Sequence, residues 1–428
     1  MSASRMPLGR AHMLASSIIR DARRAGLGSD SITPAGSLRR FAPDVGVVAL
    51  LGIVPAASHK DVLRAFARLP AVLSASRGTD NSVTVVTARG TVALHLAAPE
   101  DAGAALVWHT GSKAHTAQLR DRAAAARLRF ADGTLTDTSG ARIPCETEAE
   151  FYSRLTLPFI TPELRHGTDE VDAAAANRLP QLVEERHIRG DLHTHSTWSD
   201  GQNTIADMVS AAKQLGYEYL AITDHSESAW SSRKLTRADV PKQRKELDAL
   251  RDRTTGIDIL HGVEVDILPD GTLDFDDDLL RGFDIVLASL HDSGGHNGPT
   301  LTDRYLKVID NPLVNVITHP ANRSPAHSPG YALDFERLFA AAVDTGTALE
   351  IDGAPGHLDL DGDLARQAAS AGVTLVIDSD CHRLESLARQ MQFGVGTARR
   401  GWVEPRHVLN TRSAADVRRF VSDKRSRA

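Results

Sequence analysis

Cysteine is scarce in this chain of 428 residues, which contains only Cys145 and Cys381. The two lie far apart in the sequence and form neither a CxxC pair nor a zinc-finger spacing. This scarcity argues against a disulfide framework and against a Cys-rich structural zinc site. We therefore expect two free thiols, as is typical of a protein in the reducing cytoplasm.

Long apolar runs are also absent. Arginines interrupt the N-terminal segment every few positions, so it shows no apolar core of a signal peptide, and no later stretch reaches membrane-spanning length. With 42% hydrophobic residues, the chain still has enough apolar side chains for a sizeable core in two or three domains. These features predict a globular, cytoplasmic protein with no membrane partner.

Carboxylates are missing from one place where a site would need them. Residues 36–51, GSLRRFAPDVGVVALL, begin like a phosphate-binding turn. The residues of this turn that would face phosphate are Gly36, Ser37, Arg39 and Arg40. Such a turn usually serves a reaction on a triphosphate, with metal ions held by carboxylates. After Asp44 the run contains no acid, so two interpretations stay open: nucleotide binding without chemistry, or a scaffold that presents substrate elsewhere.

Seven strand-like segments, separated by amphipathic helical ones, follow from residue 189. Most are apolar and β-branched throughout, as expected for parallel strands covered on both faces. The segments are 190–196, 217–225, 257–267, 283–291, 314–320, 347–353 and 373–382. One intervening helix is expected to start at Asp334, a suitable N-cap, and another to end at Gly216. Repeated strand–helix units predict an α/β fold with a parallel (β/α) barrel of about seven strands.

Metal-ligand residue types end six of these seven segments. They are His193 and His195, His225, Glu264, His291, His319, and Asp380 with His382. Because all strand ends of one direction meet at one face of a barrel, these side chains should converge there. Cys381 alternates with its two neighbours and should point away, into the packing. A single strand-end histidine is usually structural, but this number of them predicts a multinuclear metal centre.

The donor set narrows the expected chemistry. Imidazole and carboxylate without thiolate suit Zn²⁺, Mn²⁺ or Fe²⁺. Several such ions close together usually clamp a phosphate and activate water.

The two parts of the chain differ in charge. Residues 1–160 hold 19 basic and 13 acidic residues, whereas the remainder holds 30 basic and 42 acidic ones, an excess of acid that bound cations would offset. Ordinary solvated surface charge is the alternative for most of these residues.

The motifs DLHTHSTWSDG, AITDHS, GVEVDI, ASLH, VITHP and DSDCH resemble, in order and spacing, those of the PHP (polymerase and histidinol phosphatase) domain. The resemblance implies nine ligands that hold three divalent metals per chain, so the ligands form three sets. The first set is His193, His195, Glu264 and Asp380, the second is Glu264, His291 and His319, and the third is Asp200, His225 and His382. An ordinary loop aspartate in a Ser-Asp-Gly turn is the alternative for Asp200.

The same resemblance implies metal-dependent hydrolysis of a phosphate ester, with His193, His195, Glu264 and Asp380 at the catalytic centre. Arg323, Arg399 and Arg400 stand where a residue that contacts the substrate phosphate would be expected, although each is also readable as a surface arginine. The barrel departs from its relatives at EIDGAPGHLDL. There Asp352, Gly353 and His357 replace an Asn-rich loop and an arginine, so we expect a changed substrate preference.

Nearly the whole chain resembles bacterial family X DNA polymerases that end in a PHP domain, and its first half resembles their palm and thumb. The motifs that carry this resemblance are GSLRR, TGSKAH and LPFITPELR in the first half and GVGTARRGW near the end of the chain. The helix-hairpin-helix modules of that lineage are not recognisable. The three palm aspartates align with Val47, Ala49 and Ala93, and Asp44 would lie on the opposite face of the strand. Because Mg²⁺ needs oxygen ligands, we expect this degenerate, polymerase-beta-like nucleotidyltransferase palm not to polymerise.

The resulting division is a palm at residues 1–108, a small thumb-like part at 109–165, a linker at 166–188 and a distorted (β/α)7 PHP barrel at 189–428. The leading function is a metal-dependent phosphoesterase acting on DNA 3′ ends, as a 3′–5′ exonuclease or 3′-phosphatase. Two alternatives are a small-molecule phosphatase of the histidinol-phosphatase type and a non-catalytic binding module of a DNA-repair complex. The acidic net charge weakens the DNA interpretation, because affinity for the nucleic-acid backbone is largely electrostatic.

Overall fold

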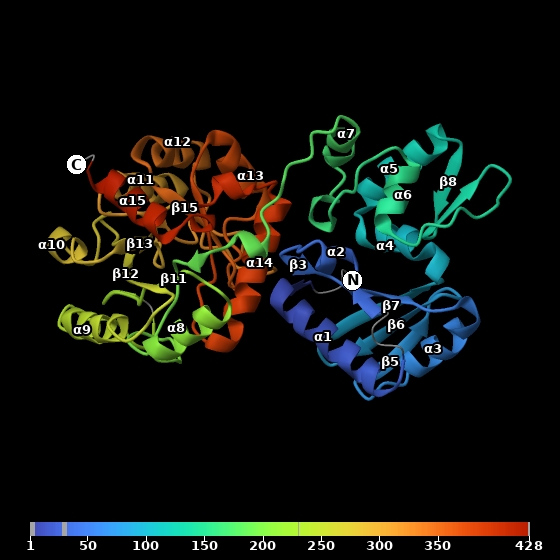
Figure 1. Cartoon of the computed structure of the whole chain (residues 1–428), viewed down its shortest axis with the longest axis horizontal. Helices are drawn as coiled ribbons and strands as arrows, with labels where there is room; N and C mark the ends of the chain where they lie inside the picture. Colours follow the sequence, from blue (N-terminus) through green and yellow to red (C-terminus); the bar gives the residue numbers. More distant parts are fainter. Residues whose placement is uncertain (1–4, 28–31, 230, 427–428) are drawn as a thin grey trace. The chain divides into compact units, whose positions relative to one another are not determined.

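The computed structural model describes residues 5–27, 32–229 and 231–426 (Figure 1). The chain divides into two compact units, Met1–Pro180 (unit 1) and Gln181–Ala428 (unit 2). This boundary falls within the predicted linker, and the end of that stretch belongs to unit 2, where Val183 N–H donates to the Val403 carbonyl at 2.9 Å. Among the described residues, no helix has both the length and the apolar character needed to cross a bilayer.

Unit 1 begins with a five-stranded sheet in the order β2–β4–β7–β6–β5. The strands are β2 (Ile32–Pro34), β4 (Val48–Ile53), β5 (Val72–Arg77), β6 (Ser82–Thr87) and β7 (Gly90–Ala97), and a short pair joins β1 (Met6–Pro7) to β3 (Asp44–Val45). Helices α1 (Leu8–Arg24), α2 (Gly36–Arg39) and α3 (His59–Phe66) accompany them. Strands β6 and β7 form a hairpin and pair antiparallel up to Thr87 and Gly90.

The second part of unit 1 is rich in helices. Its elements are α4 (Ala102–Thr110), α5 (Lys113–Ala125), β8 (Leu128–Ala131), β9 (Thr134–Asp137), α6 (Glu148–Arg154) and α7 (Glu170–Ala175). Aromatic packing holds this part together, with the Phe130 and Phe151 ring centroids 4.4 Å apart and both side chains buried. The finer division of unit 1 into a palm, a thumb-like part and a linker stays a prediction.

Unit 2 contains one sheet of seven parallel strands in sequence order, with each strand paired to the next. They are β10 (Gly190–Asp191), β11 (Tyr219–Ile222), β12 (Asp258–Asp266), β13 (Ile285–Ser289), β14 (Val316–Ile317), β15 (Ala348–Asp352) and β16 (Leu375–Asp378). All seven predicted strands are therefore present, although most are shorter than predicted. A parallel bridge between Thr194 and Cys381 joins the first strand segment to the last, so the sheet forms a nearly closed barrel.

Helices surround these strands (Figure 1). They are α8 (Ile205–Gln214), α9 (Val240–Arg251), α10 (Asp277–Leu280), α11 (Gly298–Ile309), α12 (Phe335–Thr345), α13 (Gly362–Ala371), α14 (Leu387–Arg400) and α15 (Ala414–Arg425). Asp334 caps α12 as predicted, because its side chain accepts the Arg337 N–H. Gly216 follows α8 with φ +81°, a left-handed conformation that glycine adopts without strain.

The strands alternate between two buried layers. Ile285 and Leu287 of β13 belong to an inner cluster built from strands and α15, whereas Val286 and Ala288 pack in the outer layer against the helices. The same period of two puts Glu264 on the inner side of β12, in line with Leu260. Hydrophobic side chains therefore fill the barrel below, and the polar side chains at the strand ends lie above them.

A polar clamp completes the contact between the first and last strands. Asn410 Nδ2 donates to the carbonyls of Gly190 (3.0 Å) and Ile377 (2.5 Å), and its Oδ1 accepts the Ile377 N–H at 3.1 Å. Asp378 Oδ1 accepts the Leu192 N–H at 2.8 Å. Because β10 is only two residues long, these side chains satisfy backbone groups that a longer ladder would pair.

Replacing Asn410 by alanine should destabilise unit 2. The substitution leaves buried backbone groups of Gly190 and Ile377 without partners, which we expect to lower the free energy of unfolding by roughly 2–4 kcal/mol. Urea denaturation followed by circular dichroism measures the change. Gln214→Ala removes an exposed amide and is the control, and a loss for Asn410→Ala no larger than for this control would contradict the role of the clamp.

Candidate metal centre

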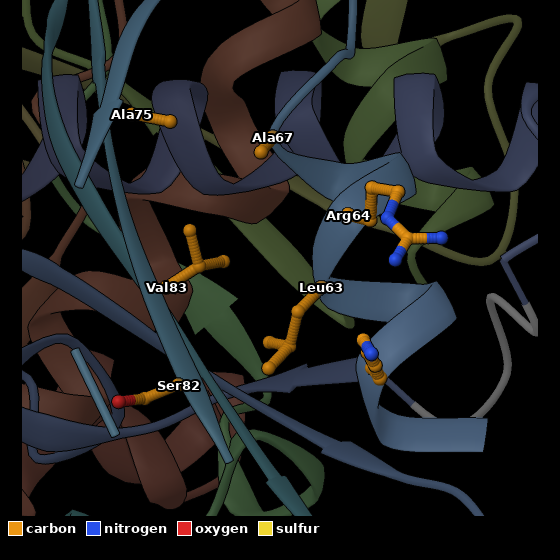
Figure 2. A pocket seen from close by; sticks show the side chains of 7 residues that line it. Leu63, Arg64, Ala67, Ala75, Ser82 and Val83 are labelled. Carbon is orange, nitrogen blue, oxygen red and sulfur yellow. The ribbon is translucent and has the colours of Figure 1, made fainter. Parts of the chain in front are cut away.

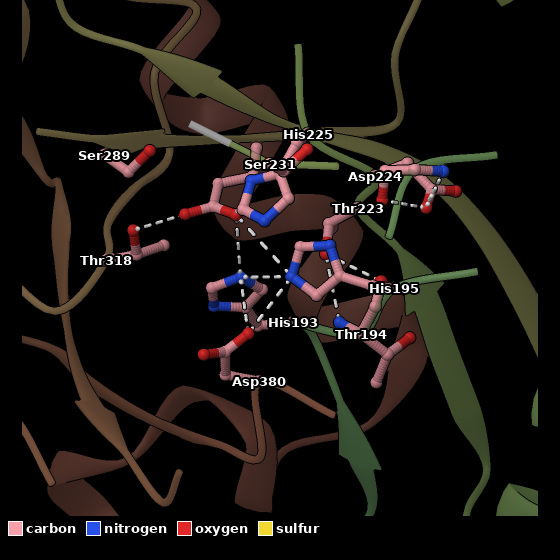
Figure 3. A network of polar contacts seen from close by, with 12 residues as sticks. His193, Thr194, His195, Thr223, Asp224, His225, Ser231, Ser289, Thr318 and Asp380 are labelled. Atoms are coloured by element: carbon pink, nitrogen blue, oxygen red, sulfur yellow. Dashed lines mark hydrogen bonds and ion pairs between the residues drawn. The ribbon is translucent and has the colours of Figure 1, made fainter. Parts of the chain in front are cut away.

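The polar side chains at the strand ends converge on one buried region of unit 2 (Figure 3). His193 and His195 follow β10, His225 follows β11, and Asp380 and His382 follow β16. Glu264 lies on β12 itself. His193, His195 and Glu264 are fully buried, so their polar atoms have no access to bulk water. The convergence matches the expectation for parallel strands that end at the same face of a barrel.

Glu264 is the centre of this cluster. Its Oε2 lies 3.3 Å from His193 Nε2 and 2.7 Å from His225 Nδ1. Its Oε1 lies 3.0 Å from His319 Nε2 and 3.5 Å from His291 Nε2. Burial raises the pKa of the Glu264 carboxyl, but His225 and His193 outweigh burial and hold this pKa well below its usual range. The carboxylate is therefore ionised and shared among side chains from four strands.

His193, His195 and Asp380 form a tight group beside Glu264. The two Nε2 atoms of His193 and His195 are 3.1 Å apart, and Asp380 Oδ1 lies 3.1 Å from His195 Nε2. Figure 3 shows these side chains pointing toward one another. Two imidazole nitrogens that converge on a carboxylate leave lone pairs directed at a common point, which is the arrangement that a cation requires.

Asp200, His225 and His382 also come together. Asp200 Oδ1 lies 3.2 Å from His382 Nε2 and 3.6 Å from His225 Nε2. The rings of His195 and His382 stack with centroids 4.1 Å apart. Asp200 therefore lies within the cluster rather than in a remote turn, as its assignment to the third predicted set requires.

All nine sequence-predicted positions are thus brought together, with a grouping that differs in detail from the predicted sets. In each group, one ligand atom per residue lies within 4.8 Å of those of the others. Eight of the nine fall into three groups: His195, Asp200, His225 and His382; His193, His195 and Asp380; and His225, Glu264 and His291. The ninth, His319, joins the cluster through its 3.0 Å contact with Glu264. His195 and His225 each belong to two of these groups, whereas the prediction assigned each of them to a single metal.

The donors fit divalent cations. His225 Nδ1 and Glu264 Oε2 lie 2.7 Å apart, yet neither atom has a hydrogen bond, and His319 Nδ1 and His195 Nδ1 are also buried without one. Burial and the neighbouring His382 lower the pKa of His195 to about 3, so its imidazole is in the neutral form that binds metals. Buried, unsatisfied donor atoms of this kind are uncommon unless an ion or ligand completes them.

The palm positions of unit 1 are close together but have no carboxylate. Ala49 of β4 and Ala93 of β7 are direct partners in the parallel ladder, and a Cβ on Gly36 would lie 3.1 Å from that of Ala49. Val47 is 39% exposed, and Asp44 forms an ion pair with Arg5 at 2.5 Å. Gly36, Ala49 and Ala93 therefore lie close together without supplying a metal ligand.

The arginines of the Gly-Ser turn already have partners within unit 1. Arg39 donates from both terminal nitrogens to the carboxylate of Glu148, each at 2.7 Å, and Arg40 donates to the Thr110 carbonyl at 2.5 Å. Glu148 also pairs with the buried Arg165 at 2.6 Å. A role of this turn in binding phosphate, with Gly36 and Ser37, stays a prediction, and Arg39 would have to leave Glu148 to take part.

A cavity of about 300 Å³ lies elsewhere in unit 1, between α3 and the strands β5 and β6 (Figure 2). Its lining is mainly apolar, with Lys60, Arg64 and Ser82 as the polar members. None of the sequence-predicted site residues lines this cavity. It therefore offers no support for a metal or phosphate site in unit 1.

Comparison with known proteins places these features in a family. The DNA polymerase beta thumb model matches residues 105–166, and the PHP domain model matches residues 191–317. The DNA polymerase/3′-5′ exonuclease PolX of Bacillus subtilis is 38% identical over 392 residues, covering 90% of this chain and 68% of that protein. The chain belongs to the PHP-containing family X of DNA polymerases.

Relatives of the barrel alone include a probable phosphatase of Shewanella oneidensis, 34% identical over 209 residues that cover 46% of this chain and 77% of that protein. A probable phosphatase of Thermoanaerobacter pseudethanolicus is 28% identical over 247 residues, 55% of this chain and 95% of that protein. The PHP domain and these relatives identify the chain as a phosphoesterase of the PHP type.

Three further carboxylates of the PHP barrel, which the sequence did not reveal, accept hydrogen bonds from two of the histidines or from the residue that follows His195. Glu350 accepts the His193 Nδ1–H at 2.7 Å and the His319 backbone N–H at 2.7 Å. Asp266 accepts the His291 Nδ1–H at 2.9 Å, and Asp224 accepts the Ser196 N–H at 2.8 Å. The sequence does contain a signal for Glu350, because it is an acid in the middle of an otherwise apolar strand. A carboxylate buried at such a position requires a polar partner.

The candidate phosphate-binding arginines lie in different surroundings. Arg323 NH1 pairs with Asp361 at 2.8 Å, and its backbone N–H points to the buried Asp359, so it lies in the loop after His319. Arg399 donates to the Val183 carbonyl at 3.0 Å, and the Cβ of Arg400 packs against Gly362. These contacts place Arg399 and Arg400 in the outer helix layer of the PHP barrel, and of the three only Arg323 lies in a loop that directly follows a cluster histidine.

Glu350 should control metal affinity through His193. The carboxylate fixes the His193 tautomer that leaves Nε2 free as a ligand, so Glu350→Gln should lower the affinity for Mn²⁺ about 10–100-fold. Calorimetric titration of the metal-free protein measures this affinity. Glu336→Gln, an exposed position on α12, is the matched control, and an unchanged affinity in Glu350→Gln would refute the positioning role.

Proposed function

We propose that the barrel of this chain hydrolyses phosphate esters at the 3′ ends of nucleic acids, and that the palm does not transfer nucleotides. One contrast carries the proposal. Nine ligand-type side chains converge in unit 2, whereas Val47, Ala49 and Ala93 offer no oxygen ligand in unit 1. A two-metal transfer reaction requires such oxygens, while hydrolysis by the barrel does not depend on them.

We assign the nine ligands to three divalent ions, Mn²⁺ or Zn²⁺ with Fe²⁺ as a further candidate. These ions would neutralise phosphate charge and lower the pKa of water. The residues of the chain fix the donors in advance. Glu350 orients His193, Asp266 orients His291, and Asp224 anchors the loop after His195. Because Glu264, His193 and His195 are buried, bulk water cannot screen the charges that develop there.

The choice of DNA 3′ ends rests on relatedness across both units. The Bacillus subtilis relative, whose name includes 3′-5′ exonuclease, matches 90% of this chain rather than the barrel alone. A thumb-like segment in the same chain as the barrel would be of little use to an enzyme for small metabolites. We also propose the predicted division into a palm (1–108), a thumb-like part (109–165), a linker (166–188) and a barrel (189–428).

A small-molecule phosphatase is the second candidate. It is supported by the probable phosphatases that match the barrel, and by the net charge of −6, which weakens electrostatic attraction to DNA. On this candidate, Arg323 beside the cluster would contact the phosphate of a monoester. The two candidates predict opposite orders of substrate preference, so a direct comparison separates them.

The first test compares a 3′-tailed DNA, the same DNA with a 3′-phosphate, and a sugar phosphate, each with Mn²⁺. We expect the DNA substrates to be hydrolysed fastest, and His193→Ala to reduce hydrolysis by about 100-fold or more because one ligand of the cluster is lost. His327→Ala, an exposed histidine of the same barrel, is the matched control. Preference for the sugar phosphate would favour the second candidate, and activity that is unchanged in His193→Ala would exclude both.

The second test concerns the palm. Primer extension with Mg²⁺ and all four nucleotides should give no product, because Ala49 and Ala93 cannot hold the ions. Gly36→Val disrupts the turn, since Gly36 has φ +60° and its Cβ would meet Ala49. Nucleotide addition that survives in His193→Ala but disappears in Gly36→Val would contradict the proposal.

A further inference from the structure

A further group of ligand-type side chains lies beside the nine. Asp352 ends β15, His357 belongs to the loop that follows it, and Asp380 is shared with the histidine cluster. One ligand atom from each of these three residues lies within 4.8 Å of those of the others. Asp352 and His357 are outside the set of nine and have no task in the proposed hydrolysis.

Asp352 is fully buried, and only one of its two carboxylate oxygens has a hydrogen-bond partner. Its Oδ1 accepts the Ala354 N–H at 2.6 Å, but its Oδ2 is buried without a hydrogen bond. A carboxylate oxygen of Asp352 lies within 4.8 Å of a carboxylate oxygen of Asp380. A buried carboxylate oxygen that faces other carboxylates is unfavourable unless a cation or proton lies between them.

His357 is held in place by its own loop. Its backbone N–H donates to the Ala354 carbonyl at 2.9 Å, and its ring stacks on His319 with centroids 5.0 Å apart and an angle of 21°. The loop folds back on β15, where the Leu360 N–H donates to the Glu350 carbonyl at 3.0 Å. His357 Nδ1 is buried without a hydrogen bond, so this imidazole has a ring nitrogen without a partner.

We propose that Asp352, His357 and Asp380 form an additional divalent-cation site, joined to the histidine cluster through the shared Asp380. Two carboxylates and one imidazole, with no thiolate nearby, suit Mn²⁺ or Zn²⁺. The ion would offset the charges of Asp352 and Asp380 and supply a partner for the unsatisfied Oδ2. With three protein ligands, it would keep coordination positions open for water or a phosphate oxygen of the substrate.

Sharing one carboxylate has a consequence for binding. Asp380 has two oxygens, so one can bind a cation on the side of His195 and the other a cation on the side of Asp352. The additional ion would then bind with lower affinity than the ions held by the histidines, because it has fewer imidazole ligands. This site therefore requires Asp352 and His357 but not His225 or His291.

The experiment counts bound Mn²⁺ per chain, by equilibrium dialysis and elemental analysis, in the full-length protein and in Asp352→Asn and His357→Gln. We expect each variant to bind one ion fewer than the unmodified chain, while it retains the others and its thermal unfolding transition. Asp361→Asn is the matched control, because Asp361 lies in the same loop and asparagine preserves its capping of α13. This control should bind as many ions as the unmodified chain.

Two results would overturn the inference. If both variants bind as many ions as the unmodified chain, Asp352 and His357 hold none. If either variant loses every ion, these residues support the whole centre and do not form a separate site. Hydrolysis of 3′ ends is measured on the same preparations, so an active protein whose variants keep every ion would refute this inference and leave the proposed function intact.

Discussion

Five histidines have a ring nitrogen within 3.5 Å of the carboxylate of Glu264, which is itself fully buried. Placing one carboxylate among so many imidazoles is favourable only if cations or protons balance the lone pairs that face one another. The barrel is built around this requirement. Its strands bring the donors to one point, and the buried carboxylates of Glu350 and Asp266 orient the rings of His193 and His291.

The nearly closed barrel depends on polar contacts as much as on its hydrophobic layers. The first strand is too short for a full ladder, so Asn410 and Asp378 complete its pairing with the last strand. These contacts hold His193 and His195 opposite Asp380, which follows the last strand. The stability of the barrel and the geometry of its metal centre are therefore linked through the same few residues.

The two units differ in the metal-ligand side chains that they supply. Unit 1 keeps the neighbouring strands and the Gly-Ser turn of a palm, but alanines occupy the paired positions on β4 and β7, and Arg39 is engaged with Glu148. Unit 2 keeps every ligand-type side chain and carries Asp352 and His357 in the loop after β15. This contrast supports the proposal that the barrel, and not the palm, is the catalytic part of the chain.

The sequence by itself determined the seven strands, their parallel arrangement and the nine candidate ligands, because buried parallel strands are apolar runs and a polar residue at their ends stands out. It also identified Val47, Ala49 and Ala93 as lacking oxygens. Only the tertiary structure decided that Glu350 and Asp266 support His193 and His291, that His195 and His225 each lie between two groups, and that His357 stacks on His319. These contacts join residues far apart in the chain, and their partners depend on strand order, on inward alternation and on how a loop folds back. None of these is encoded in local spacing.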